Sequence, residues 1–277
     1  MKLSSKILIG LGIALFIIPI VTTSYIVGHN RVDTKVYEDI LRQEGTDPNS
    51  KDTYLKTFKT KNFNNVNVIG NQKGSIGLFL VKSDKYAVKM DKNSESEVAV
   101  SVTAEGQLNI ELKDNAKSFY KRIYIFTPNI AQIKLSNLSV NDFSGQCDQL
   151  DIIGDTIEEF KFNSNIAINK LTLHLRKSLL NSTQSESIQI PDFNLDLDSS
   201  VVNLVNQNNG QVFVHAKDSK VNFSGKDPNV KLKSLHLKTV GNTVINLNDS
   251  QVENIDGQLS DETKTDFTLS TLREFLK

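Results

Sequence analysis

Cysteine, tryptophan and proline are scarce in this chain. It has one cysteine, Cys147, no tryptophan and five prolines among 277 residues. A single cysteine excludes an intramolecular disulfide, and no Cys or His lies near Cys147 at metal-ligand spacing, so we predict no metal site there. We expect this thiol to be a small buried hydrophobic group. Few prolines together with much Asn, Ser, Val and Leu are typical of short strands joined by polar turns.

An excess of charge is also lacking, because 32 basic residues balance 32 acidic ones. Without a basic patch, nucleic acid is not an expected partner. The chain has no Gly-Lys-Ser/Thr phosphate loop, no His-Glu-x-x-His zinc motif and no Gly-x-Ser-x-Gly elbow. We therefore predict no cofactor and no catalytic residues.

The first 28 residues contain the clearest long apolar run. Residues 7–27 carry no charged side chain and follow Lys2 and Lys6. About 20 apolar residues match the thickness of a bilayer core, and flanking lysines favour a cytoplasmic N-terminus. We predict a transmembrane helix in residues 1–28 that anchors the chain in a membrane, with the rest outside the cytoplasm. The alternative is a signal peptide, because Ile7–Val21 has the length of a signal h-region; no clear small-x-small cleavage site follows it.

Two segments separate this run from the repeats. Residues 29–61 are polar, and the spacing of apolar residues predicts a short helix within Asp33–Gln43 of a juxtamembrane stalk. Residues 62–128 alternate apolar and polar positions, with a hairpin signal at Thr103–Gln107. We predict a partly antiparallel β-meander over residues 62–128 that caps the open end of a repeat stack.

Residues 129–277 contain recurring units, seen best in Leu195–Leu204, Val214–Phe223 and Leu235–Leu247. Each unit is an apolar/polar alternation, a small-polar break and a second alternation, which indicates strands with one buried face. Recurrence at about 20 residues indicates a solenoid. We predict an all-β fold, a parallel β-helix or β-roll, whose last strand is Thr265–Leu269. Residues 270–277 are expected to form a helical turn that covers the final coil with Leu272, Phe275 and Leu276.

The opening of the β-region carries a resemblance. Phe63–Val68, Leu78–Leu80, Gln107–Leu112 and Ile123–Ile130, which lead into Ile133–Ser136, resemble the start of the GIN-domain, or auto-transporter adhesin head, family. The resemblance extends over residues 63–269. It implies a β-helix or β-roll in bacterial cell-envelope proteins, common among Bacteroidetes, with an adhesin role. It implies no catalytic residues.

The candidate binding residues come from aligning the repeats by their first strands. This alignment places one set of outward residues in a ladder: Lys134, Asp151, His174, Asp196, His215, His236 and Asp256. One interpretation is a plain polar surface. A sharper hypothesis is that Asp196, His215 and His236 bind a ligand or a transition metal, or respond to pH, since histidine titrates near neutrality. A spacing of about 4.8 Å on a flat sheet suits a tetrahedral metal site poorly.

The charges beside this ladder lead to a structural interpretation. Asp198 lies two residues after Asp196, and the other coils supply Arg176, Lys217 or Lys238 opposite it. Cross-strand charge pairing accounts for this pattern. We predict a membrane-anchored envelope solenoid with a structural or adhesion-like role. The alternatives are an envelope module that binds a glycan or a protein, and a carbohydrate-active β-helix enzyme.

Overall fold

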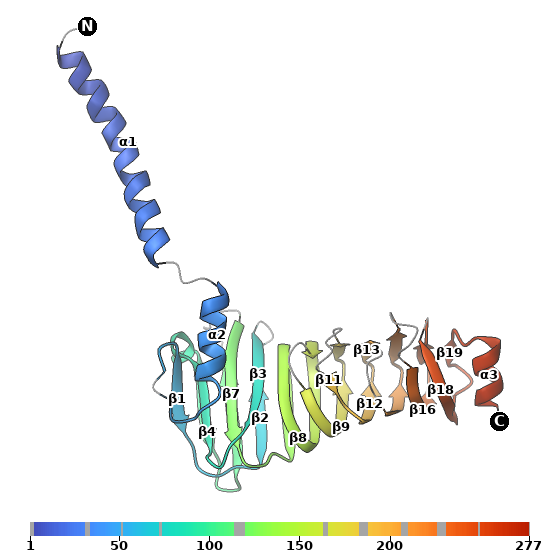
Figure 1. Cartoon of the computed structure of the whole chain (residues 1–277). Coiled ribbons are helices and arrows are strands. Elements are labelled where there is room, and N and C mark those ends of the chain that lie inside the picture. The colour runs from blue at the N-terminus through green and yellow to red at the C-terminus, as the bar shows by residue number, and fades with distance from the viewer. Residues whose placement is uncertain are drawn as a thin grey trace. The chain divides into compact units, whose positions relative to one another are not determined.

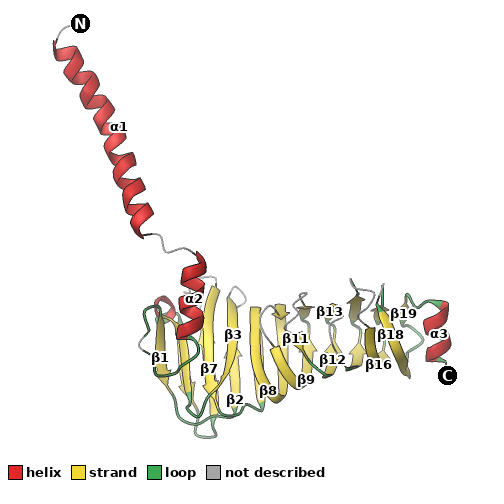
Figure 2. Cartoon of the chain, in the orientation of Figure 1, coloured by secondary structure: helices red, strands yellow, loops and turns green. Residues whose placement is uncertain are grey.

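A computed structural model describes residues 3–30, 34–50, 52–71, 74–113, 120–162, 166–182, 188–205, 210–225, 231–248 and 250–276. The chain divides into two compact units, Met1–Gln43 and Glu44–Lys277. The first unit contains helices and the second contains the strands (Figure 2).

The first unit consists of helix α1 (Leu3–Asn30) and most of helix α2 (Thr34–Glu44). The helix predicted within residues 33–43 is confirmed by α2. In the described part of the chain, no helix has the length and apolar character needed to cross a membrane. The transmembrane helix predicted for residues 7–27 is therefore unconfirmed, and the side chains of residues 7–9 and 27 lie outside the described part.

In its described residues, the second unit is built almost entirely from strands, with one short 3₁₀ helix (Lys92–Ser94) and a C-terminal helix α3 (Leu269–Phe275) (Figure 1). The first strands are β1 (Leu55–Lys59), β2 (Asn65–Ile69), β3 (Ser75–Lys82), β4 (Ala87–Asp91), β5 (Val98–Val102), β6 (Gln107–Leu112) and β7 (Tyr120–Thr127). The long β8 (Gln132–Phe162) follows, and then β9 (Ile166–Arg176), β10 (Leu179–Ser182), β11 (Ile188–Gln189), β12 (Asp192–Asp198), β13 (Val201–Val205), β14 (Gln211–Lys217), β15 (Lys220–Ser224), β16 (Lys231–Val240), β17 (Val244–Asn246), β18 (Gln251–Gln258) and β19 (Lys264–Thr265).

Successive coils stack as parallel strands on two faces. We call face A the parallel series of residues 149–155 of β8 with β9, β12, β14, β16 and β18. Face B is the parallel series of residues 160–162 of β8 with β10, β13, β15, β17 and β19. Inward side chains align from coil to coil, as in Leu171, Phe193, Val212 and Leu235, which are all buried. The predicted all-β parallel solenoid is confirmed.

The N-terminal end combines parallel and antiparallel pairing. β2 pairs in parallel with both β6 and β8, and β3 pairs in parallel with both β7 and β8. The pairs β1–β4, β4–β7 and β5–β6 are antiparallel. Two coils of the parallel stack therefore lie within residues 62–128, where the sequence predicts only a partly antiparallel meander. Alternation of apolar and polar residues reports which face is buried, and it does not report the direction of the neighbouring strand.

A network around the buried Lys89 side chain secures the chain before β1. The Lys89 ammonium donates to the carbonyls of Glu44 and Asp47, at 2.8 and 2.5 Å, and lies 2.7 Å from a carboxylate oxygen of Asp52. The Glu44 carboxylate accepts backbone N–H groups from Thr53, Tyr54 and Leu55. Because a buried charge is tolerated only when paired and hydrogen-bonded, this network ties residues 44–55 to β4.

The corner between face A and face B has a repeated conformation. The residue that begins it has a positive φ, in Lys177 (49°), Ser199 (53°) and Asp218 (49°). A buried serine follows each of them, Ser178, Ser200 or Ser219. The Ser200 hydroxyl accepts the N–H of Ser178, and the Ser219 hydroxyl accepts the N–H of Ser200, at 3.1 and 3.0 Å. This hydroxyl ladder satisfies backbone groups that burial at the corner would otherwise leave unpaired.

Helix α3 lies at the C-terminal end of the stack (Figure 1). The rings of Phe267 and Phe275 have centroids 6.0 Å apart and pack against the core, in agreement with the predicted covering role of Phe275. Leu276 is 80% exposed, so its predicted place on the covering side is wrong. The last strand ends at Thr265 rather than Leu269, because Thr268 caps the N-terminus of α3.

An asparagine ladder runs along the outer side of face B. Asn181, Asn203, Asn222 and Asn246 occupy one position in successive coils. The Asn203 amide donates to Asn181, the Asn222 amide to Asn203 and the Asn246 amide to Asn222, at 2.7, 2.7 and 2.8 Å. Asn203 and Asn222, the two middle members of the ladder, therefore each donate one side-chain hydrogen bond and accept another. This arrangement links the coils through side chains as well as through the backbone.

Substitution Asn203→Ala tests the contribution of this ladder to stability. It removes two side-chain hydrogen bonds and leaves half-buried amide groups on Asn181 and Asn222 without their partner. We expect the free energy of unfolding to fall by about 1–3 kcal/mol. Thermal and denaturant unfolding followed by circular dichroism measures the change. Gln211→Ala, at an exposed position of β14, is the control, and equal melting temperatures for the two variants would contradict a role for the ladder.

Candidate functional site

The outward side of face A brings two of the three predicted binding residues together. Asp196 pairs with His174 on one side and with His215 on the other. One carboxylate oxygen lies 3.0 Å from Nδ1 of His174, and the second lies 3.2 Å from Nδ1 of His215. About half of each of the three side chains is exposed, so the triplet lies at the surface.

His236 does not belong to this ladder. The residue opposite His215 is Lys238, and His236 lies opposite Phe213. The two rings stack with centroids 4.5 Å apart and an interplanar angle of 15°. His236 Nδ1 also lies 2.7 Å from a carboxylate oxygen of Asp256. The predicted alignment is therefore shifted by two residues at β16, a slip that keeps outward residues outward.

The corner explains the position of each member. His174, Asp196, His215 and Lys238 each lie three residues before a positive-φ residue, which is Lys177, Ser199, Asp218 or Gly241. Among the other predicted ladder members, Asp151 faces Thr172, Lys134 faces Asn67, and Asp256 faces His236. In the sequence, the corner lies in the small-polar break between the two alternations of each unit. Counting three residues back from this break is the signal that could have found the correct ladder.

The next outward ladder on face A is charged. It consists of Asp155, Arg176, Asp198 and Lys217, so acidic and basic residues alternate from coil to coil. Arg176 forms an ion pair with Asp155. Asp198 faces Arg176 and Lys217 as the sequence suggests, whereas Lys238 faces His215. Neighbouring coils thus place opposite charges side by side, which favours this register.

Metal-ligand geometry is lacking in the described residues, where no group of three His, Cys, Asp or Glu side chains could hold a metal ion. In the triplet on face A, each imidazole directs Nδ1 to the carboxylate of Asp196. The arrangement offers a carboxylate held between two imidazoles on a flat sheet. Such a surface can exchange hydrogen bonds with a ligand through exposed donors and acceptors.

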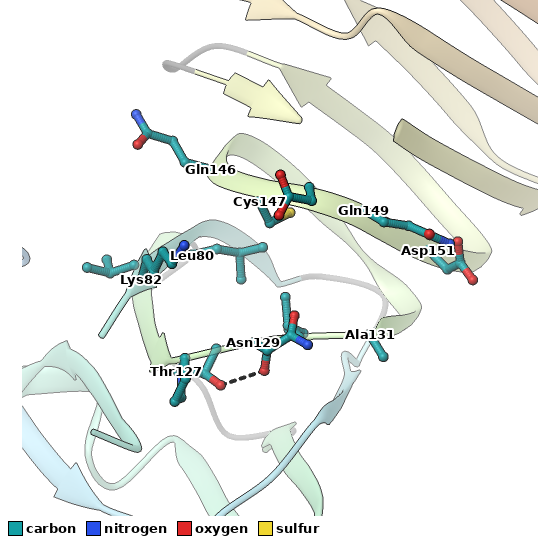
Figure 3. A pocket seen from close by; sticks show the side chains of 13 residues that line it. Leu80, Lys82, Thr127, Asn129, Ala131, Gln146, Cys147, Gln149 and Asp151 are labelled. Atoms are coloured by element: carbon teal, nitrogen blue, oxygen red, sulfur yellow. Dashed lines mark hydrogen bonds between the residues drawn. The ribbon is translucent and has the colours of Figure 1, made fainter. Parts of the chain in front are cut away.

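A groove of about 540 Å³ lies where the coil β2–β3 meets β8 (Figure 3). We call it the Cys147 groove. Its walls come from three segments: the end of β3 (residues 80–82), the connection between β7 and β8 (residues 127–131), and the bend of β8 (residues 146–151). In Figure 3 the side chain of Asn129 points into the space between the last two segments. No motif in the sequence brings these segments together, and sequence reasoning missed the groove.

The Cys147 groove has an aliphatic floor and a polar rim. Leu80 is half-buried on the floor, whereas Asn129, Asp148 and Gln149 are exposed. Asn169 Nδ2 donates to Asp148 at 3.0 Å and so orients this carboxylate. A concave surface that combines apolar contact with a few polar groups is the usual form of a small-ligand site.

The sequence predicts a buried thiol at Cys147, whereas the structure shows a half-buried side chain. Burial of the thiol, followed by the nearby charge of Asp148, raises its pKa to about 11. At neutral pH the thiol is therefore protonated and a poor nucleophile. Its place in the groove makes it a chemical reporter of what enters there.

Comparisons with known proteins give only distant likenesses. No family model matches the chain, and no curated protein matches it. Solved structures that are similar include a "putative adhesin" from Parabacteroides merdae (14% identity, TM-score 0.43, 76% of this chain and 91% of that chain). A second "putative adhesin", from Bacteroides fragilis, has 13% identity, a TM-score of 0.38 and coverage of 78% and 96%. A "putative lipid binding protein" from Parabacteroides distasonis has 14% identity, a TM-score of 0.31 and coverage of 76% and 92%. Likenesses at this level do not assign a function, and the resemblance to the GIN-domain family stays a prediction.

The pH dependence of Cys147 alkylation tests its environment. A thiol with a pKa of about 11 gains thiolate tenfold per pH unit up to about pH 10, so the iodoacetamide rate should keep rising in this range. In urea the ordinary cysteine pKa of about 8.5 returns, and we expect on the order of 100-fold faster reaction at pH 8. Circular dichroism at each pH checks that the protein is folded. A rate that levels off by pH 9 in the folded protein would show that the thiol is not desolvated.

Proposed function

We propose that this chain is a bacterial cell-envelope protein with a structural or adhesion-like role, and that face A is its contact surface. The observation that carries the proposal is the continuous outward surface of face A, where the triplet His174, Asp196 and His215 adjoins the alternating charges of Arg176 and Asp198. Parallel coils present these groups at a regular spacing of about 4.8 Å. A repetitive partner, such as an envelope glycan or an extended protein, suits such a surface.

Exposure and rigidity support this role. The strands of face A are held by backbone pairing on both sides and by the buried residues of the core, so the outward side chains start from fixed positions. Little ordering is then needed when a partner binds, which lowers the entropic cost of binding. No catalytic step is part of the proposal, because the paired charges on face A serve cross-strand contacts.

A location outside the cytoplasm is the second part of the proposal. The apolar residues 7–27 after Lys2 and Lys6 support an inner-membrane anchor. Export followed by cleavage of this segment is the alternative. In both cases Glu44–Lys277 would face the envelope.

Adhesion of beads coated with the full chain tests the contact surface. We expect retention on an array of bacterial envelope polysaccharides and envelope proteins, and at least fivefold weaker retention for Asp196→Ala, which takes the shared carboxylate from His174 and His215. Asp84→Ala removes an exposed acidic group between β3 and β4 and is the charge-matched control. Retention that is absent on every surface, or unchanged by Asp196→Ala, would refute the role of face A.

Fractionation of cells tests the location. The native chain should sediment with the inner membrane, resist extraction at high salt, and become accessible to protease from the periplasmic side. Replacing two apolar residues of the run by Asp, at Leu11 and Phe16, should release or deplete the membrane-bound protein, because each charge costs about 2.5–3.5 kcal/mol at the centre of a bilayer helix. The double substitution Ser4→Asp and Ser5→Asp, before the run, controls for added charge. Protease resistance in spheroplasts would contradict export.

A further inference from the structure

We propose that the Cys147 groove is a binding site for a neutral saccharide unit. This site adjoins the first strand of face A through Gln149 and Asp151, but its lining does not include His174, Asp196 or His215. Its lining residues come from β3, the connection between β7 and β8, and the bend of β8. The proposal therefore goes beyond an adhesion-like role, although a saccharide site also suits an envelope protein.

The size and floor of the groove fit a sugar ring. A volume of about 540 Å³ falls within the range of about 300–1,000 Å³ that is usual for small-ligand sites. Leu80 leaves part of its aliphatic surface uncovered on the floor of the groove, which Cys147 also lines. A pyranose ring has a face of C–H groups, and burying such a face against aliphatic carbon removes apolar surface from water.

The rim matches hydroxyl groups. Asn129 and Gln149 line the groove with exposed side chains. A carboxamide both donates and accepts hydrogen bonds, as a sugar hydroxyl does, whereas a carboxylate only accepts. Asp148 adds an acceptor oriented by Asn169. Three such groups around one cavity can satisfy several hydroxyls at once.

The charges of the lining select a neutral ligand. Asp148 and Asp151 oppose one basic group, Lys82, among the lining residues. The excess of acidic groups disfavours phosphate, sulfate and sugar acids, because like charges repel at short range. The carboxamide groups and the aliphatic floor provide no selectivity for a small inorganic cation.

The groove is held in shape by contacts between coils. The Asp151 N–H donates to the Ala131 carbonyl at 3.2 Å, which joins two walls. The Thr127 hydroxyl donates to the Asn129 carbonyl at 2.7 Å and fixes the connection that carries the Asn129 amide. Gly145 lies so close to the floor that an added Cβ would stand 3.2 Å from Cβ of Leu80. A preformed site loses less entropy when its ligand binds.

Protection of Cys147 from alkylation tests the proposal. The full chain is treated with iodoacetamide at pH 9 in the presence of methyl glucoside, methyl galactoside, methyl mannoside or N-acetylglucosamine, each at about 20 mM. For a dissociation constant on the order of 1 mM, occupancy slows modification about 20-fold. We expect at least one of these probes to slow the reaction fivefold or more, and glucose 6-phosphate to have less than a twofold effect.

Variants locate the effect in the groove. Ala131→Phe adds a bulky ring at an exposed position of the groove lining, and Asn129→Ala removes the amide that points into the groove. Both should abolish the protection by the sugar, as measured by the ratio of rates with and without the probe. Ala99→Phe, at an exposed position of β5, should keep it. Circular dichroism melting curves confirm that each variant is folded.

The outcomes separate this proposal from the role of face A. Less than twofold protection by all four sugars, or protection that survives in both groove variants, would overturn the saccharide site. Equal protection by glucose 6-phosphate would overturn the selection of a neutral ligand. The variant Asp196→Ala should keep full protection, so failure of bead adhesion and failure of sugar binding are distinguishable.

Discussion

From β8 to β17, the coils turn from face A to face B at a residue with a positive φ (Thr156, Lys177, Ser199, Asp218 and Gly241), and this corner determines how they align. Lys177, Ser199 and Asp218 pass through a backbone region that is costly for most side chains. The buried serine that follows each of them returns hydrogen bonds to the corner and to the neighbouring coil. When the corners of neighbouring coils are aligned, the pairing register of the strands on both sides of the corner is fixed.

The inner and outer surfaces both depend on this alignment. Inside, Leu173, Leu195 and Val214 superimpose into an apolar column. Outside, the same register on face A places the carboxylate of Asp196 between two imidazoles. On face B it aligns the asparagines whose amides bond from coil to coil. A slip by one residue would bury the charges and expose the core, so hydrophobic burial and surface chemistry favour the same register.

Much of this architecture is readable from the sequence, because period-2 alternation and a repeat of about 20 residues follow directly from strands stacked around a core. The misplacement of His236 shows the limit. Its strand alternates as the others do, so a two-residue shift leaves the buried pattern intact, and only the corner at Gly241 reveals the true offset. The parallel pairing of β2 with β8 could not be predicted from the alternation either, because the two strands lie far apart in the sequence.

The Cys147 groove illustrates what a sequence pattern cannot show. Leu80, Asn129 and Gln149 belong to different turns of the chain and share no motif. Their meeting follows from the insertion of the coil β2–β3 between β6–β7 and β8. Periodicity identifies the strands but not this order. Candidate sites along one face of a solenoid can therefore be identified once the register is known, and sites between coils once the order of the coils is known.

The stacking register can be measured directly by nuclear Overhauser effects in the full chain with selectively protonated His and Phe. The parallel register set by the corners places the ring of His236 against that of Phe213, with centroids 4.5 Å apart. We predict strong cross-peaks between the ring protons of these two residues and none of comparable strength between His236 and His215. Strong cross-peaks between the two histidine rings, with none to Phe213, would contradict the alignment of the coils.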